Sequence, residues 1–232
     1  TGEVKCFGSN QYGSLGRDGI TVGDQSSEMG DNLLPVILGT DQVPSKLAMS
    51  FMGVCSLLES DLVQCWGYSG QGQNGIDGRG ETFSAFNMGD NIQFVPIGLN
   101  RTIVQMEGGY YQNCAVLDNG EVKCWGYNGY GQLGQDNTSG YYGPSRYAVP
   151  AVNLGVGRTA TKVSMGIWHS CALLDNGTVK CWGYNGYGQL GQDSTDQLGD
   201  AAGEMAALPA INLGLPAIDI TAGGYHTCAF LN

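Results

Sequence analysis

The sequence predicts an all-β protein built from four blade-like repeats, and three observations predict this fold. One eleven-residue segment occurs in four versions along the 232 residues. Glycine accounts for 39 residues and charged residues for only 13%, a composition that favours short strands and tight turns over helices. Eight cysteines stand at matching places in the repeats. We therefore expect a single repeat array over 1–232.

The repeat has a fixed register that begins at a cysteine. The segment 124–134, Cys-Trp-Gly-Tyr-Asn-Gly-Tyr-Gly-Gln-Leu-Gly, recurs identically at 181–191, and weaker versions begin at Cys6 and Cys65. The starts at 6, 65, 124 and 181 are 59, 59 and 57 residues apart. Such a period is typical of repeat arrays and propellers. The blade units are approximately 6–64, 65–123, 124–180 and 181–232, the last continuing into 1–5 of a neighbouring copy or of further chain.

Each unit holds about four candidate strands. The third unit has an apolar stretch at 149–154 and another at 160–165, and the fourth has the corresponding stretches at 208–213 and 217–222. A hairpin such as 170–182 follows the second stretch. Four short strands per unit are the content of a β-propeller blade.

The hairpin of the third unit can be placed residue by residue. Asp175, Asn176 and Gly177 form a three-residue turn, with glycine at the position that requires a positive φ. Pairing outward from this turn places Cys171 opposite Cys181. Directly opposed residues on antiparallel strands are close enough for a disulfide bond.

The same counting applies to the other cysteines. It pairs Cys114 with Cys124 and Cys55 with Cys65, where Asp61 takes the place of the turn glycine. Cys6 has no partner before it and Cys228 has none after it. When the end of the sequence is written ahead of its start, nine residues separate these two cysteines and Gly2 falls at the turn glycine. We therefore predict that Cys6 and Cys228 are halves of one hairpin that another copy or further chain completes.

The hairpin and the glycine-rich segment resemble those of the regulator-of-chromosome-condensation repeat family. The matching stretches are 166–173, 175–180 and 182–191, which follow the family pattern of Gly-x-x-His-Ser, an Asp-Gly-type turn and Trp-Gly-x-Asn-x-x-Gly-Gln-Leu-Gly. The resemblance implies propeller blades, and the paired cysteines resemble a secreted, disulfide-bearing branch. It does not carry over the guanine nucleotide exchange activity known in the family, because fold alone does not establish function. Family rings close with seven blades, so four blades predict an open arc or superhelical array.

Aromatic residues after the second hairpin cysteine are expected to form the core between blades. These blade-core residues are Trp66, Trp125, Trp182 and Phe7. The neighbouring glycines are expected to allow close approach of one blade to the next. They do not form a nucleotide-binding loop, since the lysine and hydroxyl residue of such loops are missing.

The cysteines and the charge restrict the partners and the compartment. Eight cysteines that fit one hairpin template favour disulfides and an extracellular or cell-surface location. Zinc is the competing interpretation, but Cys-x2-Cys spacing is absent from the sequence. The net charge of −11 argues against nucleic acid as a partner. The sequence contains no apolar run long enough for insertion into a membrane.

The remaining polar positions leave several alternatives open. His169 and His226 occupy a position that recurs once per blade, where the other copies have Gln112 and Gly53, so they predict a structural bond and not a catalytic residue. Two acidic loops could hold calcium, although solvated loop charge is the default. Their carboxylates are Asp18, Asp24, Glu28 and Asp31 in the first copy and Asp193, Asp196, Asp200 and Glu204 in the fourth. The tyrosines predict either packing between blades or an exposed binding surface; they are Tyr127, Tyr130, Tyr141, Tyr142, Tyr184 and Tyr187.

Three sequons permit N-glycosylation in a secreted eukaryotic protein. They begin at Asn100, Asn137 and Asn176. Asn176 lies in the tight hairpin turn, so Asn100 and Asn137 are the favoured sites.

These observations predict a protein that is not an enzyme and needs no cofactor. The first hypothesis is an extracellular structural repeat protein, the repeating unit of a fibre or surface array, whose partners are further copies of itself or continuing chain. The alternative is a secreted propeller module that binds a protein or a glycan. Guanine nucleotide exchange is a third and weaker hypothesis, because disulfide spacing argues against a cytosolic location.

Overall fold

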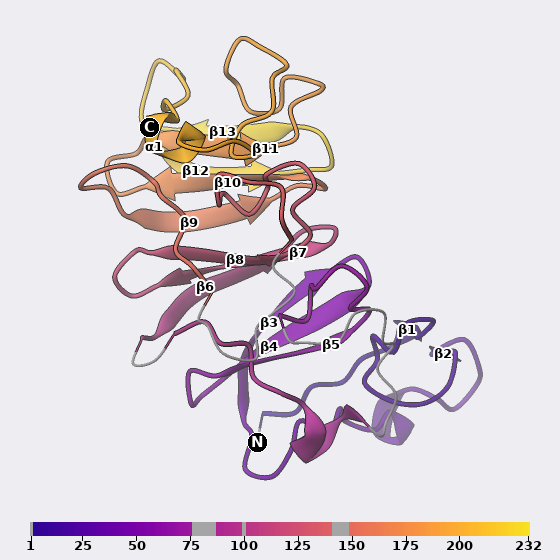
Figure 1. The fold of residues 1–232 in the computed structure, drawn as a ribbon. Helices are drawn as coiled ribbons and strands as arrows, with labels where there is room; N and C mark the ends of the chain where they lie inside the picture. Colours follow the sequence, from indigo (N-terminus) through magenta and orange to yellow (C-terminus); the bar gives the residue numbers. More distant parts are fainter. Residues whose placement is uncertain (1, 76–86, 99–100, 141–148) are drawn as a thin grey trace.

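A computed structural model describes residues 2–75, 87–98, 101–140 and 149–232 of the chain. It is an almost purely β structure, in which four small antiparallel sheets are stacked one after another (Figure 1). The sheets follow the order of the sequence, and the two ends of the chain lie at opposite ends of the stack. Over the described residues the stack is therefore an open array.

In the part of the chain that the structure describes, three of the four stacked sheets have three strands and the fourth has two. A separate pair of two-residue strands, β1 and β2, lies near the N-terminus. The strands are β1 (Gly8–Ser9), β2 (Thr21–Val22), β3 (Pro44–Ser50), β4 (Gly53–Leu58), β5 (Val63–Gly67), β6 (Ile103–Gly108), β7 (Gln112–Leu117), β8 (Val122–Gly126), β9 (Ala160–Met165), β10 (His169–Leu174), β11 (Val179–Gly183), β12 (Ala217–Ala222) and β13 (Thr227–Leu231).

The hairpin register predicted from the turn residues is confirmed. In the pair β10–β11, Cys171 lies opposite Cys181 and Leu173 lies opposite Val179. Gly177 has φ of 77° and Asp61, at the corresponding place in the first hairpin, has φ of 61°. The turn therefore needs the left-handed conformation, which glycine adopts freely and aspartate tolerates.

The fourth expected strand of each blade is reduced to a few bonds. The backbone N–H of Val152 donates to the carbonyl of Val122 at 2.8 Å, and the N–H of Ile211 donates to the carbonyl of Val179 at 2.8 Å. Pro150 and Pro209 interrupt these segments, and proline has no N–H to extend a ladder. The segment is therefore held at the sheet edge without becoming a regular strand.

Short helical turns occupy the connections. Among the described residues, the 3-10 turns η1 (Gly30–Asn32) and η3 (Gly89–Asn91) and the four-residue helix α1 (Glu204–Ala207) lie between the glycine-rich segment and the following apolar stretch. The helix-period pattern was too short to predict α1, because four residues give only one turn.

The core lies between successive sheets. Strands β3, β6, β9 and β12 contact one another in that order, and they are the first strands of their sheets. One buried cluster joins Cys114 and Val116 of one sheet to Val163 and Trp182 of the next. Each sheet is thus covered on its face by its neighbour, which is the packing of adjacent propeller blades.

Candidate functional site

The three tryptophans connect each repeat to the preceding one. Trp66, Trp125 and Trp182 are completely buried, with 0% of their surface exposed. The indole N–H of each donates to a backbone carbonyl of the glycine-rich segment one repeat earlier: Ser14 at 3.0 Å, Gln73 at 3.1 Å and Gln132 at 3.0 Å. A buried indole thus fills apolar space and satisfies its only donor.

A glycine makes room for each of these rings. A side-chain carbon at Gly134 would lie 2.9 Å from the indole nitrogen of Trp182 and 2.9 Å from a methyl group of Val152. Gly134 also has φ of 65°, which strains other residues. The glycine-rich segment therefore forms a slot for the tryptophan of the following repeat.

Phe7 does not occupy such a slot, which corrects its assignment to the blade core. Its side chain is 63% exposed. Each tryptophan occupies a slot in the repeat before its own. No repeat precedes Phe7 in the given sequence, and the glycine-rich segment whose slot is unfilled is 189–191, in the last repeat. Because the first and last sheets lie at opposite ends of the stack (Figure 1), the ring of Phe7 cannot reach that slot within one chain.

The corresponding slot at the C-terminal end is open. The three atoms nearest to a side-chain carbon at Gly191 would all belong to Ile211, the first at 2.9 Å, whereas an indole lies at the equivalent Gly134. A pocket of 270 Å³ lies at this place, lined by Gln189, Gly191, Ile211, Tyr225 and Thr227 among others. Four of these residues have repeat equivalents beside Trp182 in the complete interface: Gln189 matches Gln132, Gly191 matches Gly134, Ile211 matches Val152 and Thr227 matches Ser170.

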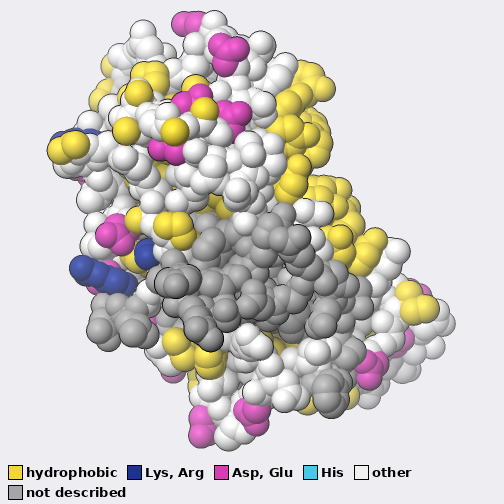
Figure 2. All heavy atoms as spheres, in the orientation of Figure 1, with side chains coloured by type: hydrophobic (Ala, Val, Ile, Leu, Met, Phe, Trp, Pro, Cys, Tyr) yellow, Lys and Arg dark blue, Asp and Glu magenta, His cyan; other side chains and the backbone are white. Residues whose placement is uncertain are grey.

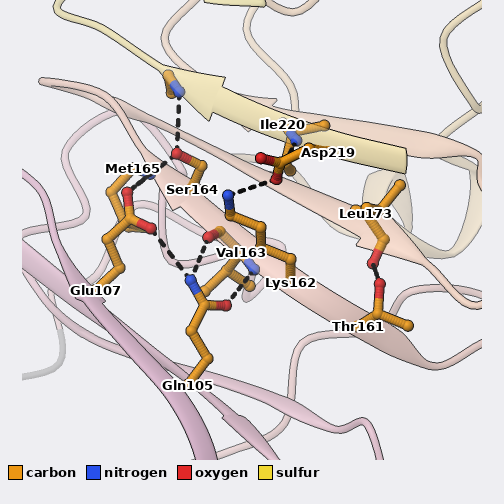
Figure 3. A network of polar contacts seen from close by, with 11 residues as sticks. Gln105, Glu107, Thr161, Lys162, Val163, Ser164, Met165, Leu173, Asp219 and Ile220 are labelled. Carbon is orange, nitrogen blue, oxygen red and sulfur yellow. Dashed lines mark hydrogen bonds and ion pairs between the residues drawn. The ribbon is translucent and has the colours of Figure 1, made fainter. Parts of the chain in front are cut away.

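A polar network connects the first strands of successive sheets (Figure 3). The Gln105 side chain accepts a hydrogen bond from the N–H of Val163 at 2.7 Å and donates to the carbonyl of Val163 at 2.8 Å. Glu107 accepts from the Ser164 hydroxyl at 3.0 Å and from the N–H of Met165 at 3.1 Å. Gln105 and Glu107 of β6 thus form hydrogen bonds with backbone groups of β9 that another β-strand does not pair.

The network continues to the last sheet. The Ser164 hydroxyl accepts from the N–H of Ala222 at 2.9 Å, and the Lys162 ammonium lies 2.5 Å from a carboxylate oxygen of Asp219. The ammonium and a backbone N–H, that of Ile220, lower the pKa of Asp219. Lys162 and Asp219 occupy the same position in the first strands of adjacent sheets, β9 and β12. Opposite charges therefore meet where these two strands face each other.

His169 holds a structural position between blades. It is completely buried, and its Nε2 lies 3.0 Å from the hydroxyl of Thr227 in the next sheet. Burial, with a smaller contribution from His226, lowers the pKa of His169 to about 4. At the same repeat position Gln112 donates to the carbonyl of Gly166 in the next blade at 3.1 Å. A glutamine at this position makes the same kind of bond, so the histidine needs no catalytic role.

Six of the cysteines are joined in pairs, and two are not. Disulfides link Cys55 to Cys65, Cys114 to Cys124 and Cys171 to Cys181, with Cα atoms 4.1 Å apart in each pair. Cys6 and Cys228 are free thiols. Burial raises the pKa of Cys6, and the nearby Arg17 partly opposes this shift.

Aromatic side chains gather along one side of the stack. Figure 2 shows a band of hydrophobic side chains down the right-hand side of the molecule. A continuous series of ring contacts, with centroids 5.1 to 6.3 Å apart, defines an aromatic strip made of Tyr127, Tyr130, Trp168, Tyr184, Tyr187 and Tyr225.

The strip only partly resolves the two interpretations of the tyrosines. Tyr187 is 71% exposed and Tyr225 is 38% exposed, so these rings present a surface. Tyr141 and Tyr142 lie outside the described residues. Sequence reasoning missed Trp168 and Tyr225, although each directly precedes a repeat histidine and could have been found from that position.

The acidic loops use carboxylates to organise their own backbone. Glu204 accepts the N–H groups of Gly199, Asp200 and Ala201 at 2.8 to 3.0 Å. Glu28 does the same for Gly23 at 2.7 Å. Among the described residues, no cluster of three or more His, Cys, Asp or Glu side chains is placed to hold a metal ion.

The sequons differ in their surroundings. Asn137 is exposed, and its side-chain amide donates to the carbonyl of Gln135 at 2.6 Å. Asn176 is exposed but accepts from the Thr178 hydroxyl at 2.7 Å within the turn. Asn100 lies outside the described residues. Over the part of the chain that the structure describes, the helices are too short and too polar to cross a bilayer.

Stacked antiparallel sheets joined by buried tryptophans define a β-propeller-type repeat protein. Models of the regulator of chromosome condensation (RCC1) repeat match residues 103–132, 160–189, 119–173 and 176–230, and together these matches run from 103 to 230. The chain belongs to the RCC1 repeat family.

Similar proteins share this repeat but are longer. The chain is 28% identical over 196 residues to human E3 ubiquitin-protein ligase HERC2 and 27% identical over 195 residues to the mitochondrial RCC1 domain-containing protein RUG3 of Arabidopsis thaliana. It spans 4% of the first and 40% of the second, so the activity of neither whole protein is carried by this match.

Solved structures support the same fold. The structure of Prp20p from Saccharomyces cerevisiae superposes with a TM-score of 0.72 at 19% identity, covering 98% of this chain and 51% of Prp20p. Human WBSCR16 superposes with a TM-score of 0.51 at 16% identity, covering 97% of this chain and 66% of that one. At these identities the likeness establishes the propeller fold alone.

Proposed function

We propose that this chain is a non-enzymatic, extracellular structural repeat protein whose copies join head to tail into a fibre or surface array. The observation that carries the proposal is the complementarity of the two ends of the stack. The C-terminal end has a two-stranded sheet beside the open slot at Gly191. The N-terminal end carries Phe7, which is exposed and is the repeat equivalent of Trp182.

Exposed apolar side chains on the two end faces support this association. Phe230 is 68% exposed, whereas its repeat equivalents Leu57, Val116 and Leu173 are at most 6% exposed. At the other end Leu47 is 47% exposed, and its equivalents are at most 8% exposed: Met106, Val163 and Ile220. Apolar groups that every internal interface buries are thus uncovered at both ends, which favours burial against a neighbouring blade, supplied by another copy or by further chain.

Disulfides and composition support an extracellular material. Each complete hairpin carries a buried disulfide, and such bonds persist in oxidising compartments. Only 13% of the residues are charged, and the net charge is −11.

The test is the size of the purified chain as a function of concentration. We expect assemblies larger than the 24.4 kDa monomer in analytical ultracentrifugation, and head-to-tail filaments in electron micrographs. The substitution Phe230→Glu should weaken assembly, since it places a charge on the end face. Val156→Glu is the matched control, because Val156 is fully exposed but lies in a loop between internal sheets. A single monomeric species at all concentrations would contradict the proposal.

The aromatic strip supports a second function, the binding of a protein or a glycan. Tyrosine and tryptophan rings that are partly exposed offer large apolar faces with polar edges, as in many interfaces. Prp20p, which shares the fold, binds Gsp1p and histones, so protein recognition has a precedent among proteins of this architecture. Glycan-array and pull-down binding that is lost in a Tyr130→Ala, Tyr184→Ala double variant, and retained in Val156→Ala, would support this function.

A further inference from the structure

Each disulfide of the described chain closes a hairpin within one repeat. The two cysteines of each pair are 10 residues apart and lie on neighbouring strands of one sheet. Successive repeats are held together by packing and by hydrogen bonds, such as that from the indole of Trp182 to the carbonyl of Gln132. Among the described residues, no disulfide therefore crosses from one repeat to the next.

Two of the junctions bring tyrosine rings of successive repeats into contact. The ring centroids of Tyr12 and Tyr68 lie 5.2 Å apart, and those of Tyr130 and Tyr184 lie 5.1 Å apart. The ring planes are inclined by 65° and 59°, so the edge of one ring approaches the other ring. All four residues are half-buried, so a reagent in solution can reach both rings of each pair.

The two contacts are the same contact in successive parts of the repeat. Tyr12 and Tyr130 each stand six residues after the cysteine that begins their unit, whereas Tyr68 and Tyr184 each stand three residues after theirs. The centroid distances differ by only a tenth of an ångström. The contact is therefore a product of the repeat geometry and not of one local side-chain arrangement.

The backbone holds the second tyrosine of each pair in the same way. The N–H of Tyr68 donates to the carbonyl of Met52 at 2.8 Å, and the N–H of Tyr184 donates to the carbonyl of Trp168 at 2.8 Å. The hydroxyl end of the Tyr184 ring lies over Gly186, where a side-chain carbon would overlap it, and the same holds in the first pair. The glycine thus leaves room for the ring to lie across its own turn.

We propose that these inter-repeat tyrosine pairs are sites of oxidative coupling, at which a carbon–carbon bond joins Tyr12 to Tyr68 and Tyr130 to Tyr184. The oxidant is hydrogen peroxide acting through a peroxidase, which removes one electron at a time from phenols. Each bond closes a junction between repeats that the disulfides leave open. The coupling lies within one chain and is independent of the head-to-tail association.

The coupling balances with one hydrogen peroxide for each bond. Each phenol loses one electron and its hydroxyl proton, which gives a phenoxyl radical with spin density on the ring carbons next to the carbon that bears oxygen. The two radicals join through these carbons. The hydrogen on each joined carbon then moves to the oxygen, and both rings regain their aromaticity. Two hydrogen atoms are lost in all, and they reduce hydrogen peroxide to two waters.

The junction between these two lacks the pair and provides a control within the same chain. Gln71 occupies the first position of the pair there, and Tyr127 occupies the second. The N–H of Gln71 donates to the side-chain oxygen of Gln73 at 2.9 Å, as the N–H of Tyr130 does to that of Gln132 at 2.9 Å. The backbone is thus held alike at both places, so Gln71→Tyr should bring a ring next to Tyr127.

One exposed contact has to be removed before the test. The rings of Tyr187 and Tyr225 lie 5.1 Å apart, but both residues belong to the last repeat. Their coupling would not join two repeats. The substitution Tyr187→Phe removes one phenol and keeps the ring, so it serves as the background for all variants.

The test treats the full chain with hydrogen peroxide and a haem peroxidase at low protein concentration. After isolation of the monomer, reduction and digestion, we expect dityrosine fluorescence and two cross-linked peptide pairs, each lighter by two hydrogen atoms than the sum of its parts. Tyr12→Phe should remove the first pair and Tyr130→Phe the second. Tyr127→Phe is the matched control and should leave both. Gln71→Tyr should add a third link, to Tyr127.

Stability provides a second readout. The bond closes a much longer loop than the 10 residues between hairpin cysteines, and closing a longer loop restricts the unfolded chain more. The oxidised chain should therefore unfold at a higher urea concentration than the double variant Tyr12→Phe, Tyr130→Phe treated in the same way. The two proteins should unfold alike before oxidation, since phenylalanine keeps the ring contact.

Three outcomes would overturn the proposal. The first is oxidation that consumes tyrosine but leaves the two peptide pairs unlinked. The second is coupling between chains without coupling inside them. The third is a link from Tyr130 to Trp168, whose ring also lies 5.1 Å away, in place of the link to Tyr184. None of these outcomes bears on filament formation, so the head-to-tail function is tested separately.

Discussion

The indole N–H of Trp182 donates to the backbone carbonyl of Gln132, one full repeat earlier, at 3.0 Å. The same carbonyl accepts the Ser170 hydroxyl at 2.8 Å, so two side chains of one blade converge on one oxygen of the preceding blade. The indole bond to the preceding repeat recurs at Trp66 and Trp125. It makes each blade dependent on its predecessor, as in other repeat arrays in which neighbours provide the core.

Removal of a tryptophan should therefore destabilise the array strongly. We expect Trp125→Ala to lower the free energy of unfolding by roughly 3 to 5 kcal/mol, since the ring is fully buried between blades. Trp125→Phe keeps much of the apolar contact but leaves the Gln73 carbonyl without its indole donor, so it should cost less. Chemical denaturation followed by circular dichroism measures both. A negligible loss in Trp125→Ala would contradict the packing role.

The disulfides should contribute modestly, because each closes a short loop. The cysteines of each pair are 10 residues apart in sequence. We expect the double substitution Cys114→Ala, Cys124→Ala to cost on the order of 2 to 3 kcal/mol. Peptide mapping under non-reducing conditions should recover Cys55–Cys65, Cys114–Cys124 and Cys171–Cys181 and no other pairing among these six. Another pairing would contradict the hairpin register.

Glu107 should be important for the contact between the second and third sheets. Its carboxylate accepts from Ser164 and from the backbone N–H of Met165. We expect Glu107→Ala to cost roughly 2 to 3 kcal/mol, because two donors lose their partner. Glu107→Gln retains an acceptor oxygen and should cost about 1 kcal/mol. Equal stability of both variants and the parent in urea titrations would contradict this role.

His169 should make stability depend on pH below neutrality. Its pKa is lowered from 6.5 to about 4, so the unfolded chain binds a proton in this range that the folded chain does not. The stabilisation is fully present above pH 6.5 and is lost as pH falls toward 4, by roughly 3 kcal/mol in total. In His169→Gln, which copies Gln112, the difference in unfolding free energy between pH 7 and pH 4 should be smaller. An unchanged pH profile would contradict it.

The sequons should be unequal when the chain passes through a eukaryotic secretory pathway. Asn137 is exposed, whereas Asn176 is engaged with Thr178 inside a hairpin turn. We expect a glycan at Asn137 and little at Asn176. Mass spectrometry before and after endoglycosidase treatment, with Asn137→Gln as the control, tests this order. Preferential modification of Asn176 would contradict it.

Much of the fold could be predicted because the repeat is long and regular. The spacing of the cysteines and the turn residue Gly177 were enough to predict the strand register, since a two-residue alternation and a fixed turn leave one pairing. The fourth strand was only partly predicted. Its pairing is reduced to a few bonds by Pro150 and Pro209, and the balance between a strand and a loosely held segment depends on the neighbouring sheet edge.

The candidate site was less predictable than the fold. The sequence placed Phe7 in the core by analogy with Trp182, yet its side chain is 63% exposed. A repeat pattern reports which residues are equivalent, but it does not report whether the neighbour that would bury one of them is present. The aromatic strip likewise combines Tyr130 and Trp168 from different sequence positions, and only the stacking of sheets brings them into contact.

The sequence by itself determined the period, the hairpin register and the residues that recur at each blade interface, because these depend on local turn geometry and on repetition. The tertiary structure decided the openness of the array, the exposure of Phe7 and the row of bonds from Glu107 to Ala222 through Ser164. The physical reason is that these features depend on the rotation and separation between one sheet and the next. That geometry arises from the packing of whole blades, and it is not encoded at any single position.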